Sequence, residues 1–138
     1  EFRPVANEAS IELTYQCLAS PHVNADGQRL VQVMENLVSN AVKFSPEGSE
    51  VTVKLLLTDR NWARVEVCDH GSGISAHDLP RLFEKFQQLE SPDRRLRGGT
   101  GLGLSICKAI MEAHGGHVGV ISREGHGSTF WFEIEPLQ

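Results

Sequence analysis

The chain has 138 residues, of which 40% are hydrophobic and 22% charged, and its net charge is −5. This size and composition predict a single globular domain that buries a core of its own. The acidic balance argues against nucleic acid as the main partner, because binding to phosphates needs clustered cations and the one dense basic run lies at residues 94–97. The longest apolar stretch is far shorter than the ~20 residues of a membrane helix, so we expect no contact with a membrane.

The first half of the chain predicts a strand, a helix and a hairpin. Apolar and polar residues alternate over residues 11–17, which is typical of a strand with one buried face. Residues 28–44 have helical periodicity, with a capping segment before them and Ser45-Pro46-Glu47-Gly48 to end the helix. Alternation returns over residues 51–57 and 63–67, and the short turn between them predicts an antiparallel hairpin.

The second half predicts two more helices and a last pair of strands. A short helix is expected around residues 78–86, and a second one over 102–114, where Gly115-Gly116 ends it. Residues 87–100 are polar and have no periodicity, which indicates a functional lid or a disordered loop. Strands follow at 118–120 and 130–134, with a turn between them. This order predicts a two-layer α/β (α+β) sandwich, with about five mostly antiparallel strands and about three helices on one face.

Cys17, Cys68 and Cys107 are far apart and each lies in an apolar pattern, so we expect three small core residues in a reducing compartment. The six histidines fall in predicted loops or at helix ends, and we expect them at the surface.

A polar stripe runs along the helix predicted at 28–44. Asn36, Asn40 and Lys43 fall within about 60° of one another at ~100° per residue, beside the apolar face. Asparagine is a mediocre helix former, whereas its amide oxygen can bind magnesium and lysine can bind phosphate. The stripe by itself is equally consistent with a solvated helix face.

Two glycine-rich segments are further candidates. Asp69 ends a predicted buried strand before Gly71 and Gly73, and a carboxylate there suits an amino-bearing ring such as adenine, although a plain turn has the same composition. The run of residues 98–103 opens into a helix, where free amides and the helix dipole favour an anion over a mere flexible hinge. Leu104 stands where a Walker loop requires lysine.

In this order and spacing the segments resemble the catalytic domain of sensor histidine kinases, which has the Bergerat fold and shares an ATPase superfamily with gyrase B, MutL and the ninety-kilodalton heat-shock chaperone. The resemblance covers roughly residues 22–135 and joins five segments: 35–44 resemble the asparagine box, 69–74 the first glycine box, 82–86 the phenylalanine box, 99–104 the second glycine box, and 127–130 the segment behind the adenine pocket.

The resemblance implies ATP and Mg²⁺ as cofactors and a role for each matching residue. Asn40 would be the metal ligand, with Asn36 as its partner and Lys43 on the phosphates, and an arginine of the lid (about 87–101), Arg94 or Arg97, would reach the γ-phosphate. The catalytic residues would then be Asn36, Lys43 and Arg97. Around the base the implied residues are Phe44, Asp69, Gly71, Gly73, Ile74 and Thr129; around the phosphates they are Thr100, Gly101, Leu102, Gly103 and Leu104; Phe83 and Phe86 would anchor the lid.

The implied function is transfer of the γ-phosphoryl group of Mg-ATP to a histidine on a separate dimerisation and phosphoacceptor domain, with a response regulator receiver domain downstream, in the cytoplasm or in the cytoplasmic part of a membrane-bound sensor. ATP-hydrolysing relatives have a glutamate base where this chain has Asn36, and an amide lacks that basicity, which favours transfer over hydrolysis. These 138 residues contain no His-Glu-Leu-Arg-Thr-Pro-like acceptor stretch, so we expect no self-phosphorylation. Alternatives are a serine kinase of the anti-sigma-factor type and a nucleotide-sensing module without catalysis.

Overall fold

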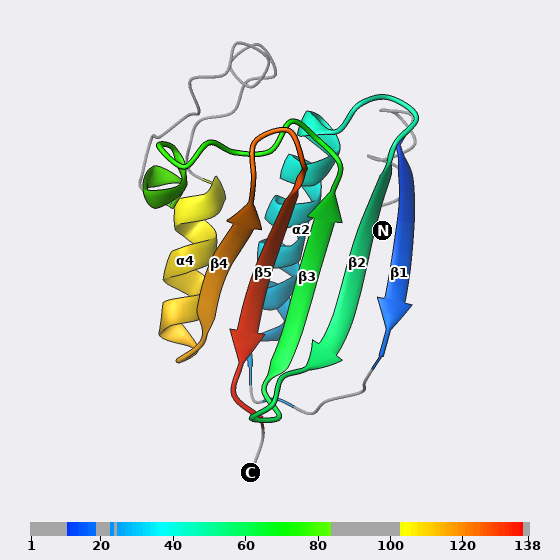
Figure 1. Ribbon diagram of the computed structural model, residues 1–138. Coiled ribbons are helices and arrows are strands. Elements are labelled where there is room, and N and C mark those ends of the chain that lie inside the picture. Colours follow the sequence, from blue (N-terminus) through cyan, green and yellow to red (C-terminus); the bar gives the residue numbers. More distant parts are fainter. Residues whose placement is uncertain (1–10, 19–22, 24, 84–102, 137–138) are drawn as a thin grey trace.

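A computed structural model of the chain describes residues 11–18, 23, 25–83 and 103–136. Its five strands form one mixed sheet in the order β1-β2-β3-β5-β4, in which β1 and β2 are parallel and all other neighbours antiparallel. The strands are β1 (Glu12–Cys17), β2 (Glu50–Leu57), β3 (Ala63–Asp69), β4 (His117–Ser122) and β5 (Ser128–Ile134). The helices α2 (Gly27–Phe44) and α4 (Gly103–Ala113) both lie behind the sheet (Figure 1), which confirms the predicted two-layer sandwich. None of the described helices is long and apolar enough to cross a bilayer.

The two α-helices begin and end at recognisable capping residues. The Asp26 carboxylate accepts the amides of Gln28 and Arg29, at 3.0 and 3.3 Å, and so caps α2. At the end of α4, Gly115 has a φ of +70° and the Gly116 amide donates to the Met111 carbonyl at 2.8 Å. This is a Schellman motif, and it turns the chain directly into β4.

The core lies between the sheet and the helices. Alternate residues of β3 and β5 point into it, so Val65, Val67, Phe130 and Phe132 are buried while their neighbours face the open side of the sheet. From α2 and α4 the core receives fully buried side chains, among them Val33, Leu37, Cys107 and Met111. This packing fixes the position of both helices against the strands that carry the candidate site.

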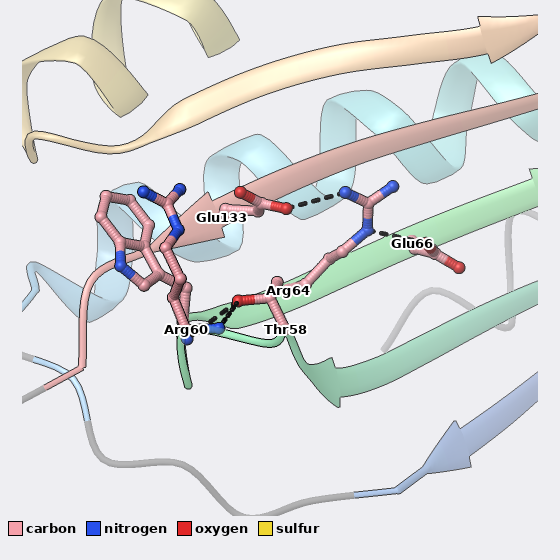
Figure 2. Close-up of polar contacts among 6 residues, drawn as sticks. Thr58, Arg60, Arg64, Glu66 and Glu133 are labelled. Carbon is pink, nitrogen blue, oxygen red and sulfur yellow. Dashed lines mark hydrogen bonds and ion pairs between the residues drawn. The ribbon is translucent and has the colours of Figure 1, made fainter.

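The open side of the sheet is ordered by a charged cluster. The Arg64 guanidinium donates to Glu66 and Glu133, both at 2.7 Å, and lies over the Trp131 ring at 4.5 Å from its centroid. Figure 2 shows the two carboxylates on either side of the guanidinium. Burial lowers the pKa of Arg64, but its hydrogen bonds to Glu133 and Glu66 outweigh that effect and raise it overall. The cluster ties β3 to β5.

Three expectations need correction. β1 is an edge strand, and of the alternating apolar residues predicted to face the core only Ile11, just before the strand, and Leu13 are buried. Tyr15 is 40% exposed and Cys17 is exposed. The prediction of a core position is therefore wrong for Cys17, and Cys68 is only partly buried; Cys107 is in the core. Of the helix predicted around 78–86, the described part forms a short 3₁₀ turn, η1 (Leu79–Arg81), in which the Leu82 amide donates to the Leu79 carbonyl three residues earlier at 3.4 Å. Residues 84–86 lie outside the description.

Candidate functional site

The polar stripe of α2 meets the first turn of α4. The Asn36 side-chain amide donates to the Gly103 carbonyl at 3.4 Å, and a Cβ on Gly103 would come within 3.9 Å of that amide. Asn40 is partly buried and Lys43 is exposed on the same side of the helix. The stripe therefore borders the N-terminus of α4, where the helix dipole favours an anion.

Cys107 of α4 also contacts Asn36. Its thiol is fully buried and donates to the Val33 carbonyl at 3.8 Å. Burial raises the pKa of Cys107 to about 11, while the hydrogen bond with Asn36 lowers it by a smaller amount. The Asn36 amide is thus held between α2 and α4 by contacts with two residues of α4.

Asp69 lies at the end of β3 and keeps a carboxylate inside the fold. It is 6% exposed, and its Oδ1 accepts the Gly71 amide at 2.9 Å, which shapes the loop that follows. A carboxylate has acceptor sites for several hydrogen bonds. Burial of a carboxylate costs free energy unless the group is hydrogen-bonded. Hydrogen bonds from neighbouring groups, such as the one from the Gly71 amide, therefore hold Asp69 in place.

Two glycines bring the loop after β3 against the turn between β4 and β5. Gly73 and Gly127 have φ values of +77° and +80°. A Cβ on Gly73 would overlap the Arg123 carbonyl, and a Cβ on Gly127 would overlap the Asp69 carbonyl. Both residues must therefore be glycine for the two backbone segments to meet.

The structure also shows two residues that sequence reasoning missed, Ser122 and Ser128. They are paired across the β4–β5 hairpin, and their hydroxyl oxygens lie 2.8 Å apart. The Ser122 oxygen also accepts the Ile74 amide at 2.8 Å. A serine on either side of the predicted turn was the available signal, but the contact of Ser122 with Ile74 depends on the tertiary fold.

The remaining predicted site residues fall into two groups. Those that the structure describes lie around the same region: Gly71 and Ile74 are buried, Leu104 and Phe83 are partly buried and pack against the core, and Thr129 is opposite Cys68 in the β3–β5 pair. His70 is exposed, as expected. Outside the described residues lie the lid with Arg94 and Arg97, together with Phe86, Thr100, Gly101 and Leu102, and the side chain of Phe44.

These parts converge at one end of the sandwich. In Figure 1 the end of β3, the first turn of α4 and the last turns of α2 lie at the same end of the sheet. A buried acceptor and an anion-favouring helix terminus, bordered by amides and a lysine, suit a ligand with an amino-bearing ring and a phosphate tail.

The family model described as "Histidine kinase-, DNA gyrase B-, and HSP90-like ATPase" matches residues 25–138. The chain belongs to this family. Within it, the chain is 49% identical over 112 residues to the sensor histidine kinase AruS of Pseudomonas aeruginosa, a match that covers 78% of this chain and 11% of AruS.

The solved structures agree with the sequence match. The catalytic domain of the histidine kinase ThkA has a TM-score of 0.80 and 30% identity, with 96% of this chain and 85% of that chain covered. Full-length ShkA in complex with AMPPNP has a TM-score of 0.80 and 36% identity, over 95% of this chain and 27% of that chain. These matches confirm the resemblance: the fold and family are those of histidine kinase catalytic domains. The chain spans less than a third of the length of the first curated relatives, from 11% to 32%.

Proposed function

We propose that this domain binds Mg-ATP and transfers its γ-phosphoryl group to a histidine on a separate dimerisation and phosphoacceptor domain. A response regulator receiver domain would take the phosphoryl group in turn, and the reaction would take place in the cytoplasm. The observation that carries the proposal is the junction of α2 and α4, where Asn36 contacts Gly103 at the start of α4 while Asp69 supplies a buried acceptor at the same end of the sheet.

Asp69 would select the base. Its carboxylate would accept a hydrogen bond from the exocyclic amino group of adenine, and the Gly71 amide already orients it. Guanine presents a carbonyl oxygen at the equivalent position, and two acceptors facing each other repel. A site built to accept a hydrogen bond rejects an analogue that lacks the donor, so adenine would be preferred.

The phosphates would lie at the first turn of α4, beside the stripe of α2. Asn40 would bind the metal through its amide oxygen, with Asn36 next to it, and Lys43 would reach the phosphates from the exposed edge of α2. Partly exposed amide oxygens fit Mg²⁺, which keeps several water ligands and needs few from the protein. The exposed lysine fits the negatively charged phosphates. When bound, the magnesium ion would neutralise the charge that develops on the phosphates.

Asn36 also supports transfer to another protein over hydrolysis of ATP. Its amide donates to the Gly103 carbonyl and cannot take a proton from water. The domain would then position the phosphates and their charge, and the acceptor histidine would be the nucleophile. This division of labour suits phosphoryl transfer, in which positioning and charge stabilisation dominate.

Calorimetric titration with Mg-AMPPNP tests the binding step. We expect the natural sequence to bind and Asp69→Asn to lose more than about tenfold in affinity, because the site loses a charged acceptor worth ~1.5–3 kcal/mol. Asp59→Asn is the matched control, since this exposed aspartate lies in the hairpin at the other end of β3. Equal affinity for the natural sequence and Asp69→Asn would contradict the assignment of the base site.

A second experiment tests the transfer step. The chain is incubated with labelled ATP and a purified dimerisation domain from a relative, and phosphate on that domain is tested for acid lability. We expect acid-labile phosphate on histidine, and none on the chain by itself. Acid-stable phosphate on serine would instead indicate the serine-kinase alternative, and tight binding without any transfer would indicate a nucleotide-sensing module.

A further inference from the structure

The loop of residues 70–75 and the turn of residues 123–127 are joined by more than the two glycine contacts described above. The Gly125 amide donates to the Ser72 carbonyl at 2.5 Å, and the Ile74 amide donates to the Ser122 hydroxyl at 2.8 Å. The loop is thus attached to the turn near its middle and near its end. Asp69 immediately precedes this loop.

The Ser122 hydroxyl uses its whole hydrogen-bonding capacity. It has one hydrogen and two lone pairs. The hydrogen must go to the Gly127 carbonyl at 2.9 Å, because a carbonyl can only accept. One lone pair accepts the Ile74 amide, and the second must accept the hydroxyl of Ser128 at 2.8 Å, since Ser122 has no other hydrogen to give. Ser128 is itself buried, at 4% exposed, and lies opposite Asp69 in the β3–β5 pair.

We propose that Ser122 is a positioning residue for the base-binding side of the site. Its hydroxyl fastens the loop that follows Asp69 to the β4–β5 turn and so holds the Asp69 carboxylate where an adenine amino group would meet it. This inference rests on the proposed function and adds a residue of β4 that lies 53 positions away from Asp69 in the sequence. The β4–β5 turn thereby becomes a determinant of the preference for adenine.

The number of hydrogen bonds that each substitution removes predicts how strongly it weakens nucleotide binding. Ser122→Ala leaves the Ile74 amide, the Gly127 carbonyl and the Ser128 hydroxyl without this partner. The loop then loses the attachment near its end and keeps the one from the Gly125 amide to the Ser72 carbonyl. Ser128→Ala removes only the hydrogen bond that Ser128 donates to Ser122, and it keeps the bonds of Ser122 with the Ile74 amide and the Gly127 carbonyl. Ser122→Thr keeps the hydroxyl, and threonine is favoured in strands.

Thr58 provides a matched control. Its hydroxyl accepts the backbone amides of Arg60 and Trp62, at 3.3 and 3.1 Å, in the hairpin at the opposite end of β3 from Asp69 (Figures 1 and 2). Thr58→Ala therefore removes a hydroxyl that accepts backbone amides, as Ser122→Ala does, but far from the proposed site. A purely structural role of Ser122 would affect thermal stability as Thr58 does and leave base selectivity unchanged.

The experiment measures Kd for Mg-ADP and Mg-GDP by calorimetry, and the melting temperature, for the natural chain and the four variants. For Ser122→Ala we expect a rise of about tenfold in the Kd for ADP, equivalent to ~1.4 kcal/mol, and a lower ratio of ADP to GDP affinity. Ser128→Ala should change the Kd by about twofold or less, and Ser122→Thr should restore most of the affinity. Thr58→Ala should lower the melting temperature and leave both Kd values unchanged.

The outcomes separate the two proposals. Unchanged Kd values and selectivity in Ser122→Ala, with the natural chain binding ADP, would overturn the positioning role and leave the proposed function standing. Equal losses of affinity in Ser122→Ala and Thr58→Ala would also overturn it, because the effect would then be one of general stability. Absence of ADP binding by the natural chain would overturn the proposed function first, and this inference with it.

Discussion

Gly125 and Gly127 allow backbone strain to be separated from steric contact within one turn. Both have positive φ, +83° and +80°. A Cβ on Gly125 would meet nothing within 4 Å, whereas a Cβ on Gly127 would overlap the Asp69 carbonyl and come within 3.1 Å of the His70 Cα. The two alanine variants therefore share the conformational penalty, and only Gly127→Ala adds a collision with backbone.

The expected losses of stability follow from the conformational penalty and from the steric overlap. A left-handed conformation costs a non-glycine residue ~1–2 kcal/mol, which is the whole expected effect of Gly125→Ala. Forcing extra atoms into packed structure costs a further ~1–3 kcal/mol, so Gly127→Ala should lose ~2–5 kcal/mol in all. At ~4 °C per kcal/mol for a domain of this size, the melting temperature should fall by ~4–8 °C for Gly125→Ala and by ~8–20 °C for Gly127→Ala.

Thermal unfolding followed by circular dichroism measures both variants against the natural chain. Urea titration at 20 °C gives the free energy of unfolding without extrapolation across temperature, and a constant slope with denaturant shows that the unfolded state is unchanged. Gly127→Ala should also weaken nucleotide binding, because relief of the collision moves the backbone of Asp69. Equal losses of stability in the two variants would refute the reasoning, since the contact between turn and loop would then add nothing to the strain.

Three further predictions use the same measurements. Arg64→Ala should lower the free energy of unfolding by ~1–3 kcal/mol, because Glu133 loses its charged partner in a half-buried cluster; loss of less than ~0.5 kcal/mol, as for exposed ion pairs, would contradict it. Burial raises the pKa of Cys107 to about 11 from an ordinary 9.0, so this thiol ionises at a lower pH in the unfolded chain than in the folded one. The free energy of unfolding should therefore fall between pH 9 and 11. Cys107→Ala should show a smaller fall over that range. Asp26→Ala should cost ~1 kcal/mol through loss of the α2 cap, and Asp26→Asn should retain most of it; equal losses would argue against the cap.

Local patterns in the sequence determined most of the secondary structure and the order of the site segments. The periodicity of residues 28–44 predicts α2 to within a residue, because a helix that buries one face repeats every 3.6 residues. The hairpin of β2 and β3 and the glycine end of α4 are equally local, and the spaced boxes identified the family. Asn36 and Asp69 were recognised in the sequence as members of two of these boxes, whereas the contact of Asn36 with Gly103 appears only in the fold.

The tertiary structure alone decided how the segments touch. The exposure of Tyr15 and Cys17 depends on β1 being an edge strand, which alternation along one strand cannot reveal. The bond from Ile74 to Ser122 joins residues 48 positions apart, and the need for glycine at 127 comes from the carbonyl of Asp69 on another strand. Such contacts depend on strand order and register, which arise from the packing of the whole sheet and leave no periodic trace in the sequence around each residue.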